Sequence, residues 1–237
     1  EKYGYHYLNT NDVFRVGVNY NYIGTRFDAN VSVQYISNRF FREGKIENGI
    51  FSNSFGTSGV FQQGGLGISV SGTWKLNGRN YIRFKGARQE LPNRFDQVFV
   101  NPEWRAFELN APKQTKIASA DLAYFYKAPR FKFYAGVYGM ELKDQIVNKN
   151  FYLDEQLESA SNQELSDGGL ISAFYTGLNE RHLGFEASME LNLGYGWSCT
   201  AAYSGGDHVY TSRPDLLIYD KFSTAVSSHT IYFKNFY

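Results

Sequence analysis

The segment from Leu178 to Ser204 constrains the fold more than any other part of the chain. Apolar residues occupy nearly every second position from Leu183 to Leu193, and polar residues such as Glu186 and Glu190 lie between them. A period of two over about eleven residues predicts a β-strand, because a helix would scatter these positions around its axis. The strand is long for a soluble protein and matches the length that crosses a bilayer at a tilt.

The same alternation resumes after Gly194-Tyr195-Gly196, where we expect a tight turn. From Trp197 to Tyr203, every second residue again lies in the apolar row. The two strands predict a hairpin with one apolar face toward lipid and one polar face toward a water-filled lumen. The residues expected to face lipid are Leu183, Phe185, Met189, Leu191, Leu193, Trp197 and Tyr203.

Similar alternating segments occur along the whole chain. With the hairpin they predict about nine strands, the others at 13–22, 26–37, 65–74, 80–88, 116–126, 131–140 and 230–237. Short turns at 23–25, 77–78, 127–130 and 194–196 alternate with long segments at 38–64, 89–114, 143–176 and 205–229. Asn77-Gly78 favours the positive φ angles of a type I′ turn.

This alternation of turn lengths separates two all-β architectures. A soluble β-sandwich has no reason to keep its long loops at one end, whereas outer-membrane barrels have short periplasmic turns and long extracellular loops. We therefore expect an all-β fold, an antiparallel transmembrane β-barrel segment that occupies residues 1–237 as a single unit.

Composition excludes several classes of protein. The formal net charge of +1 gives no indication of a nucleic-acid partner, and the single cysteine, Cys199, excludes an intrachain disulfide framework and a CxxC-type metal site. The mean hydropathy of −0.43 does not separate soluble proteins from membrane barrels, because a barrel hides its apolar residues in alternation. Aromatic residues make up 18% of the chain and gather near predicted strand ends, as in interfacial girdles.

Charged residues also alternate onto the polar faces. All are expected to face the lumen, where the basic residues either contact a plug or anionic ligand, or hold water and pair with the carboxylates of Glu186, Glu190 and Asp121. These residues are Arg15, Arg83, Lys85, Lys132, Glu186 and Glu190.

The long segment 89–114 is rich in Arg, Phe and Trp, the residue types of binding hot spots. Two interpretations stay open: contact with a ligand or partner, and packing of the loops against one another. The candidate contact residues are Arg94, Phe95, Phe99, Trp104, Arg105 and Phe107.

Nothing in the sequence predicts catalysis, a cofactor or a metal. The four histidines (His6, His182, His208, His229) are far apart and have no partner at metal-ligand spacing. Glu186 and Glu190 lie about 13 Å apart along a strand, too far for a catalytic carboxylate pair. The acidic run 153–169 lacks the spacing of a calcium loop, and a solvated surface is the favoured interpretation.

Four stretches resemble the barrel of TonB-dependent outer-membrane receptors. In LNERHLGFEASMELNL (Leu178–Leu193), an R-x-x-G-x-E segment begins an alternating strand, as late barrel strands of that family do. The other three are ASADLAYFYKAPRFKFYAGVYGMELKDQI, NPEWRAFELNAPKQT and TIYFKNFY. The resemblance covers Gln97 to Tyr237 best, and the Tyr and Phe content is similar to that of Bacteroidetes receptors.

This resemblance implies part of a receptor that takes up a scarce nutrient, such as a siderophore, glycan, peptide or cobalamin, across the outer membrane of a Gram-negative bacterium. The implied partners are outer-membrane lipid, the plug and remaining strands of the receptor, a TonB-type energiser and a surface lipoprotein. No plug domain or TonB box is recognisable, so we expect a C-terminal part of the barrel. The alternatives are a plugless outer-membrane channel and, less favoured, a soluble all-β binding protein.

Overall fold

The computed structural model describes residues 4–49, 51–103, 105–152, 170–219 and 227–230. These residues form one 11-stranded sheet in which neighbouring strands are antiparallel, which confirms the all-β class. The strands are β1 (Tyr7–Ile23), β2 (Phe27–Gly44), β3 (Gly56–Thr57), β4 (Phe61–Lys75), β5 (Asn80–Leu91), β6 (Thr115–Lys127), β7 (Phe131–Tyr152), β8 (Leu170–Gly194), β9 (Trp197–Tyr210), β10 (Asp215–Tyr219) and β11 (Ser227–Thr230). Two short helices, η1 (Ser52–Ser54) and α1 (Phe95–Val98), lie in the connections.

The long strands follow one another in the sheet as they do in the chain, from β1 through β2, β4, β5, β6 and β7 to β8. β7 occupies one edge of β8 over most of the length of β8. β9 and β10 therefore share the other edge of β8. β9 pairs with the half near the turn and β10 with the other half. Within the described residues the sheet is open, with β1 at one edge and β9 and β11 at the other.

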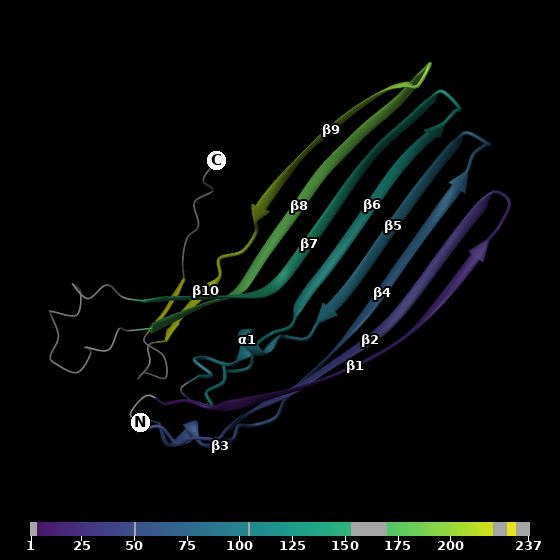
Figure 1. The fold of residues 1–237 in the computed structure, drawn as a ribbon. Coiled ribbons are helices and arrows are strands. Elements are labelled where there is room, and N and C mark those ends of the chain that lie inside the picture. The colour runs from purple at the N-terminus through teal and green to yellow at the C-terminus, as the bar shows by residue number, and fades with distance from the viewer. Residues whose placement is uncertain (1–3, 50, 104, 153–169, 220–226, 231–237) are drawn as a thin grey trace.

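All four short turns lie at one end of the sheet and all long connections at the other (Figure 1). This confirms the predicted alternation. We refer below to the turn end and the long-connection end.

The turn at Asn77-Gly78 differs from the prediction. Neither residue has a positive φ, so this is not a type I′ turn. Residues 76–79 form a wider loop in which Asn77 Oδ1 accepts hydrogen bonds from the backbone N–H groups of Arg79 (2.9 Å) and Asn80 (3.0 Å). Hydrogen bonds to the asparagine side chain thus hold this turn, in place of the positive-φ backbone that the Asn-Gly dipeptide predicts.

Several strands extend beyond their predicted ends, so the long connections are shorter than expected. β2 continues to Gly44, β7 to Tyr152, and β8 begins at Leu170. These extensions carry polar and apolar residues without strict alternation, but ladder hydrogen bonds join backbones and need no side-chain pattern. Of the predicted ninth strand, 230–237, only Thr230 lies among the described residues, as the last residue of β11; the acidic run 153–169 lies outside them.

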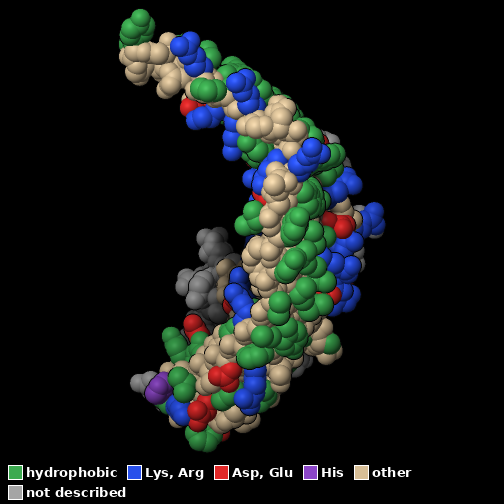
Figure 2. Space-filling view, turned by 90° about the vertical axis from the view of Figure 1, so that its right-hand side faces the viewer, with side chains coloured by type: hydrophobic (Ala, Val, Ile, Leu, Met, Phe, Trp, Pro, Cys, Tyr) green, Lys and Arg blue, Asp and Glu red, His purple; other side chains and the backbone are tan. Residues whose placement is uncertain are grey.

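The register separates two faces. Directly paired residues share a face. One row across the sheet contains Tyr22, Ala29, Gly72, Phe84, Leu122, Val137 and Phe185. The adjacent row contains Asp28, Thr73, Arg83, Ala123, Gly136, Glu186 and Ser204. We call these sides the apolar face and the polar face. Figure 2 shows the sheet curving into a crescent, with a band of hydrophobic side chains that follows the curve and charged side chains beside it toward the convex margin.

The buried hydrophobic residues gather at the long-connection end. Apart from Ala123, the buried hydrophobic residues of the described chain lie there, in or beside two clusters. At the turn end, by contrast, apolar side chains such as Tyr22, Trp74 and Leu193 are 51%, 55% and 61% exposed. The half of the sheet near the turns therefore has its apolar face uncovered.

Among the described residues, no helix is both long and apolar enough to cross a membrane.

Candidate ligand-facing surface

The polar face carries all six charged residues that the sequence assigned to a lumen. The register places Arg15, Arg83, Lys85, Lys132, Glu186 and Glu190 on one side of the sheet. Two of them pair directly: Lys132 Nζ on β7 lies 3.0 Å from Glu190 Oε1 on β8. This contact supports the interpretation in which these charges neutralise one another.

Aromatic rings lie beside two of the remaining charges on this face. The hydroxyl of Tyr134 donates a hydrogen bond of 3.4 Å to Glu186 Oε2. The guanidinium of Arg83 lies 4.8 Å from the ring centroid of Phe125. Rings beside charges can stack on a sugar or aromatic ligand while the charges orient it, so the surface suits an amphipathic solute.

The apolar face carries the seven residues expected to face lipid, and each is exposed. The register continues the alternation across the hairpin, where Leu191 lies opposite Cys199 and Ala187 opposite Tyr203. The exposed side chains are Leu183, Phe185, Met189, Leu191, Leu193, Trp197 and Tyr203.

The described part of the segment 92–112 (residues 92–103 and 105–112), between β5 and β6, folds back over the polar face at the long-connection end (Figure 1). Phe40 of β2 packs with Val98 and Phe99 in one cluster. Ile146 of β7 and Phe174 of β8 pack with other residues of the segment in the second. The segment is thereby held across the sheet, where it narrows the space above the polar face.

Asn93 fixes both ends of this segment. Its side chain donates hydrogen bonds to the carbonyl oxygens of Pro112 (3.3 Å) and Lys113 (3.0 Å). Its own carbonyl accepts one from Asn38 Nδ2 of β2, and its N–H donates to Gln63 Oε1 of β4. Asn93 is almost fully buried, so these hydrogen bonds replace hydrogen bonds that the same groups would make to water.

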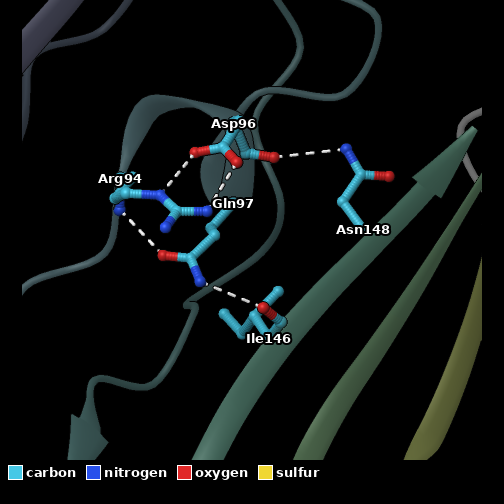
Figure 3. A network of polar contacts seen from close by, with 5 residues as sticks. All are labelled: Arg94, Asp96, Gln97, Ile146 and Asn148. Atoms are coloured by element: carbon cyan, nitrogen blue, oxygen red, sulfur yellow. Dashed lines mark hydrogen bonds and ion pairs between the residues drawn. The ribbon is translucent and has the colours of Figure 1, made fainter.

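The short helix α1 is attached to β7, as Figure 3 shows. Gln97 accepts a hydrogen bond from the backbone N–H of Arg94 and donates one of 3.0 Å to the carbonyl oxygen of Ile146. Asn148 Nδ2 donates to the carbonyl oxygen of Asp96 at 3.2 Å. Arg94 and Asp96 form a two-pronged ion pair at 3.0 and 2.8 Å, and this hydrogen bonding lowers the pKa of Asp96.

The predicted contact residues of this segment are mostly not exposed. Phe99 and Arg105 are buried, and Phe95 and Phe107 are partly buried. The guanidinium of Arg105 lies over the rings of Phe51 and Phe107, at 4.8 and 4.7 Å from their centroids. The structure therefore favours loop packing for these four residues.

Of the remaining two contact candidates, Arg94 is exposed. Trp104 lies outside the described residues. Contact of this segment with a ligand stays a prediction.

Two histidines that look isolated in the sequence are neighbours in the structure. His182 of β8 pairs directly with His208 of β9, and their rings stack with centroids 4.1 Å apart. Both Nε2 atoms lie 3.3 Å from Glu180 Oε2. The prediction that no histidine has a partner at metal-ligand spacing is therefore wrong, because it considered only spacing along the chain.

A comparison with models of known protein families gives no match, and neither does a comparison with curated proteins.

Proposed function

We propose that this chain forms part of the wall of an outer-membrane β-barrel of the TonB-dependent receptor kind, which takes up a scarce nutrient. The exposed apolar face carries the membrane part of this proposal. Leu122, Val137 and Phe185 lie side by side in the middle of the sheet and are 52%, 56% and 45% exposed. Soluble monomers rarely leave a continuous apolar surface of this kind in water.

The strand lengths and connections support the same proposal. β2 has 18 residues and β4 has 15, more than the 9–11 or so that cross a bilayer. The single-layered sheet also differs from a soluble β-sandwich, in which a second sheet covers the apolar face. Trp74 and Trp197 lie on the apolar face near the turns, where aromatic girdles meet the membrane surface.

In this proposal the polar face lines the lumen and the apolar face contacts outer-membrane lipid. Residues 92–112 fold into the extracellular mouth and shape the space that a ligand enters. The sequence resemblance supports the receptor class and, with it, a plug, the remaining barrel strands, a TonB-type energiser and a surface lipoprotein as partners. The role is binding and passage, without covalent chemistry.

A matched pair of substitutions tests the membrane part. Phe185 and Glu186 are adjacent on β8 at one depth but on opposite faces. Phe185→Lys should destabilise the protein in lipid bilayers by about 2–4 kcal/mol, and Glu186→Lys by less than about 1 kcal/mol. The measurement is reversible urea unfolding in vesicles. Equal effects of the two lysines would contradict a lipid-facing surface, because an exposed side chain in water tolerates lysine.

The intact mass of the native polypeptide in isolated outer membranes tests the receptor class. A plugged transporter barrel of 22 strands predicts a mass about three times the 27.1 kDa of this chain. A mass near 27 kDa would favour the second candidate, a plugless channel. Absence from the outer membrane would exclude both.

A further inference from the structure

We propose that Glu180, His182 and His208 form a binding site for a divalent transition-metal ion of the Zn²⁺ class. One ligand atom from each side chain lies within 4.8 Å of the other two. The two strands that supply them are joined by direct pairing, and all three side chains lie on the polar face. The inference uses only the β8–β9 register, so it does not depend on the receptor proposal.

Two of the three ligand–ligand distances fit four-coordinate geometry, and the third lies within 4.8 Å. With bonds of about 2.0–2.1 Å to nitrogen and oxygen, the ligands of a tetrahedral ion lie about 3.3–3.4 Å apart. Both Glu180–histidine distances are 3.3 Å. The imidazole planes are nearly parallel, at 12°, so the rings must tilt toward each other for both lone pairs to reach one ion. His208 is 47% exposed and has room for this movement.

The backbone beside the cluster is held by hydrogen bonds. Asn179 Oδ1 accepts one from the N–H of Asp144 on β7, and the N–H of Asn179 donates one to Ser212 Oγ. The N–H of Thr211 donates to the carbonyl oxygen of Asn179. These bonds tie β8, next to Glu180, to β7 and to the connection that follows β9, so the three ligands need little ordering on binding.

The donor set decides which ions fit. Imidazole nitrogens favour Zn²⁺, Cu²⁺ or Ni²⁺, whereas Ca²⁺ and Mg²⁺ require mostly oxygen ligands. Three protein ligands leave a fourth position for water or a donor atom of a bound solute, as in open zinc sites. The side chains of Glu180 and His182 are only 15% and 26% exposed to solvent, so they have already lost part of their hydration. An ion bound to them would supply interactions in place of the lost water.

The test is Zn²⁺ binding by the full chain, purified in detergent and stripped with a chelator. We expect one Zn²⁺ per chain and no competition from Ca²⁺ or Mg²⁺. Co²⁺ added to the stripped chain in place of Zn²⁺ should give the intense absorption of four-coordinate cobalt, and Zn²⁺ should then remove that absorption. Glu180→Gln, His182→Gln and His208→Gln should each weaken binding by at least about 100-fold, because loss of an outer-shell partner alone costs 10–100-fold.

Two control variants separate this site from general surface binding. Asp207→Asn changes the residue next to His208 on the opposite face, and His6→Gln removes a histidine at the start of the chain. Both should bind Zn²⁺ as the wild type does. Far-UV circular dichroism checks that every variant keeps its β-sheet.

X-ray absorption of the Zn²⁺-loaded wild-type chain gives a measurement that needs no variant. Scattering from two imidazole rings is expected. Binding that survives all three glutamine substitutions, absence of stoichiometric Zn²⁺, or a zinc shell without two imidazoles would each overturn the proposal.

Discussion

Arg42 Nε on β2 donates a hydrogen bond of 2.6 Å to the carbonyl oxygen of Pro102, sixty residues away in the chain. A second hydrogen bond, of 3.0 Å, runs from its Nη1 to the carbonyl oxygen of Ser54. Arg42 is 1% exposed, and its guanidinium lies over the ring of Tyr7. One buried side chain therefore joins β1, β2 and two long connections.

Arg42→Met should destabilise the protein by about 3 kcal/mol, because hydrogen bonds to a charged group contribute about 1.5–3 kcal/mol and two carbonyl groups lose their donor. Urea unfolding of the reconstituted chain measures this. Arg39→Met is the matched control: Arg39 is half exposed, and among the described residues its side chain makes a single, long ion pair, with Asp12, so its loss should cost below about 1 kcal/mol. Similar costs for both variants would contradict the anchoring role.

Gly44 has no room for a side chain. A Cβ atom there would overlap the carbonyl oxygen of Ser54, a backbone atom that cannot rotate away. Gly44→Ala should therefore cost at least about 1–3 kcal/mol and loosen the connection between β2 and β4. At Gly86 of β5 the nearest atom to such a Cβ is 3.9 Å away, so Gly86→Ala should be neutral or slightly stabilising. Unfolding midpoints of the two alanine variants, measured side by side, decide this.

The Lys132–Glu190 ion pair should contribute little to the free energy of unfolding, but the two charges should be measurably coupled. Both side chains are about half exposed, so the coupling energy from a double-mutant cycle should be about 0.2–1 kcal/mol. Exchanging the two residues should restore most of what each single charge reversal loses. Because salt screens exposed pairs, the coupling should fall in 1 M NaCl. A coupling that is zero at low salt would show that the two charges do not interact.

The ion pair of Asp96 with Arg94 should make the stability of the α1 segment depend on pH. The pKa of Asp96 is lowered in the folded chain by the hydrogen bond from Arg94, so its contribution is present above the unfolded value of about 3.9 and lost as pH falls through the folded pKa. The pair is exposed, so the contribution should stay below about 1 kcal/mol.

Hydrogen exchange of residues 92–112 in the wild type and in Asp96→Asn measures it. The two proteins should differ at pH 6 and converge at a pH below the folded pKa of Asp96, where the carboxyl is protonated and resembles asparagine. A difference that persists in acid would contradict the ion-pair origin. Asn110→Ala, at an exposed position in the same segment, is the control and should leave hydrogen exchange unchanged at both pH values.

Much of the sheet could be predicted because alternation reports directly on side-chain faces. The predicted faces of β8 and β9 are confirmed residue by residue, since a strand exposes successive side chains on opposite sides wherever it pairs. The ends of β2 and β7 were missed, because backbone pairing continues past the point where alternation stops. Burial of Phe99 and Arg105 was not predictable, because the loop sequence does not show that Phe40, Phe51 and Phe107 surround them.

The histidine cluster shows where sequence information ends. Gly194 pairs with Trp197, and an unbroken ladder from there would place Val209 opposite His182, with His208 on the other face. A one-residue irregularity between Asn192 and Gly194 shifts the register and places His208 opposite His182 instead. Because a shift of one residue moves every side chain of a strand to the other face, this single bulge decides whether the two imidazoles meet.

The sequence by itself therefore determined the eight long strands, their two faces and the end at which the turns lie, because these depend on the local period of apolar residues. The short strands β3 and β10 were not predicted, and β11 shares only Thr230 with the predicted ninth strand. The tertiary structure alone decided which side chains meet across strands and how residues 92–112 fold over the polar face. Those outcomes depend on register and on packing between residues far apart in the chain, as for Arg42 with Pro102 and His182 with His208.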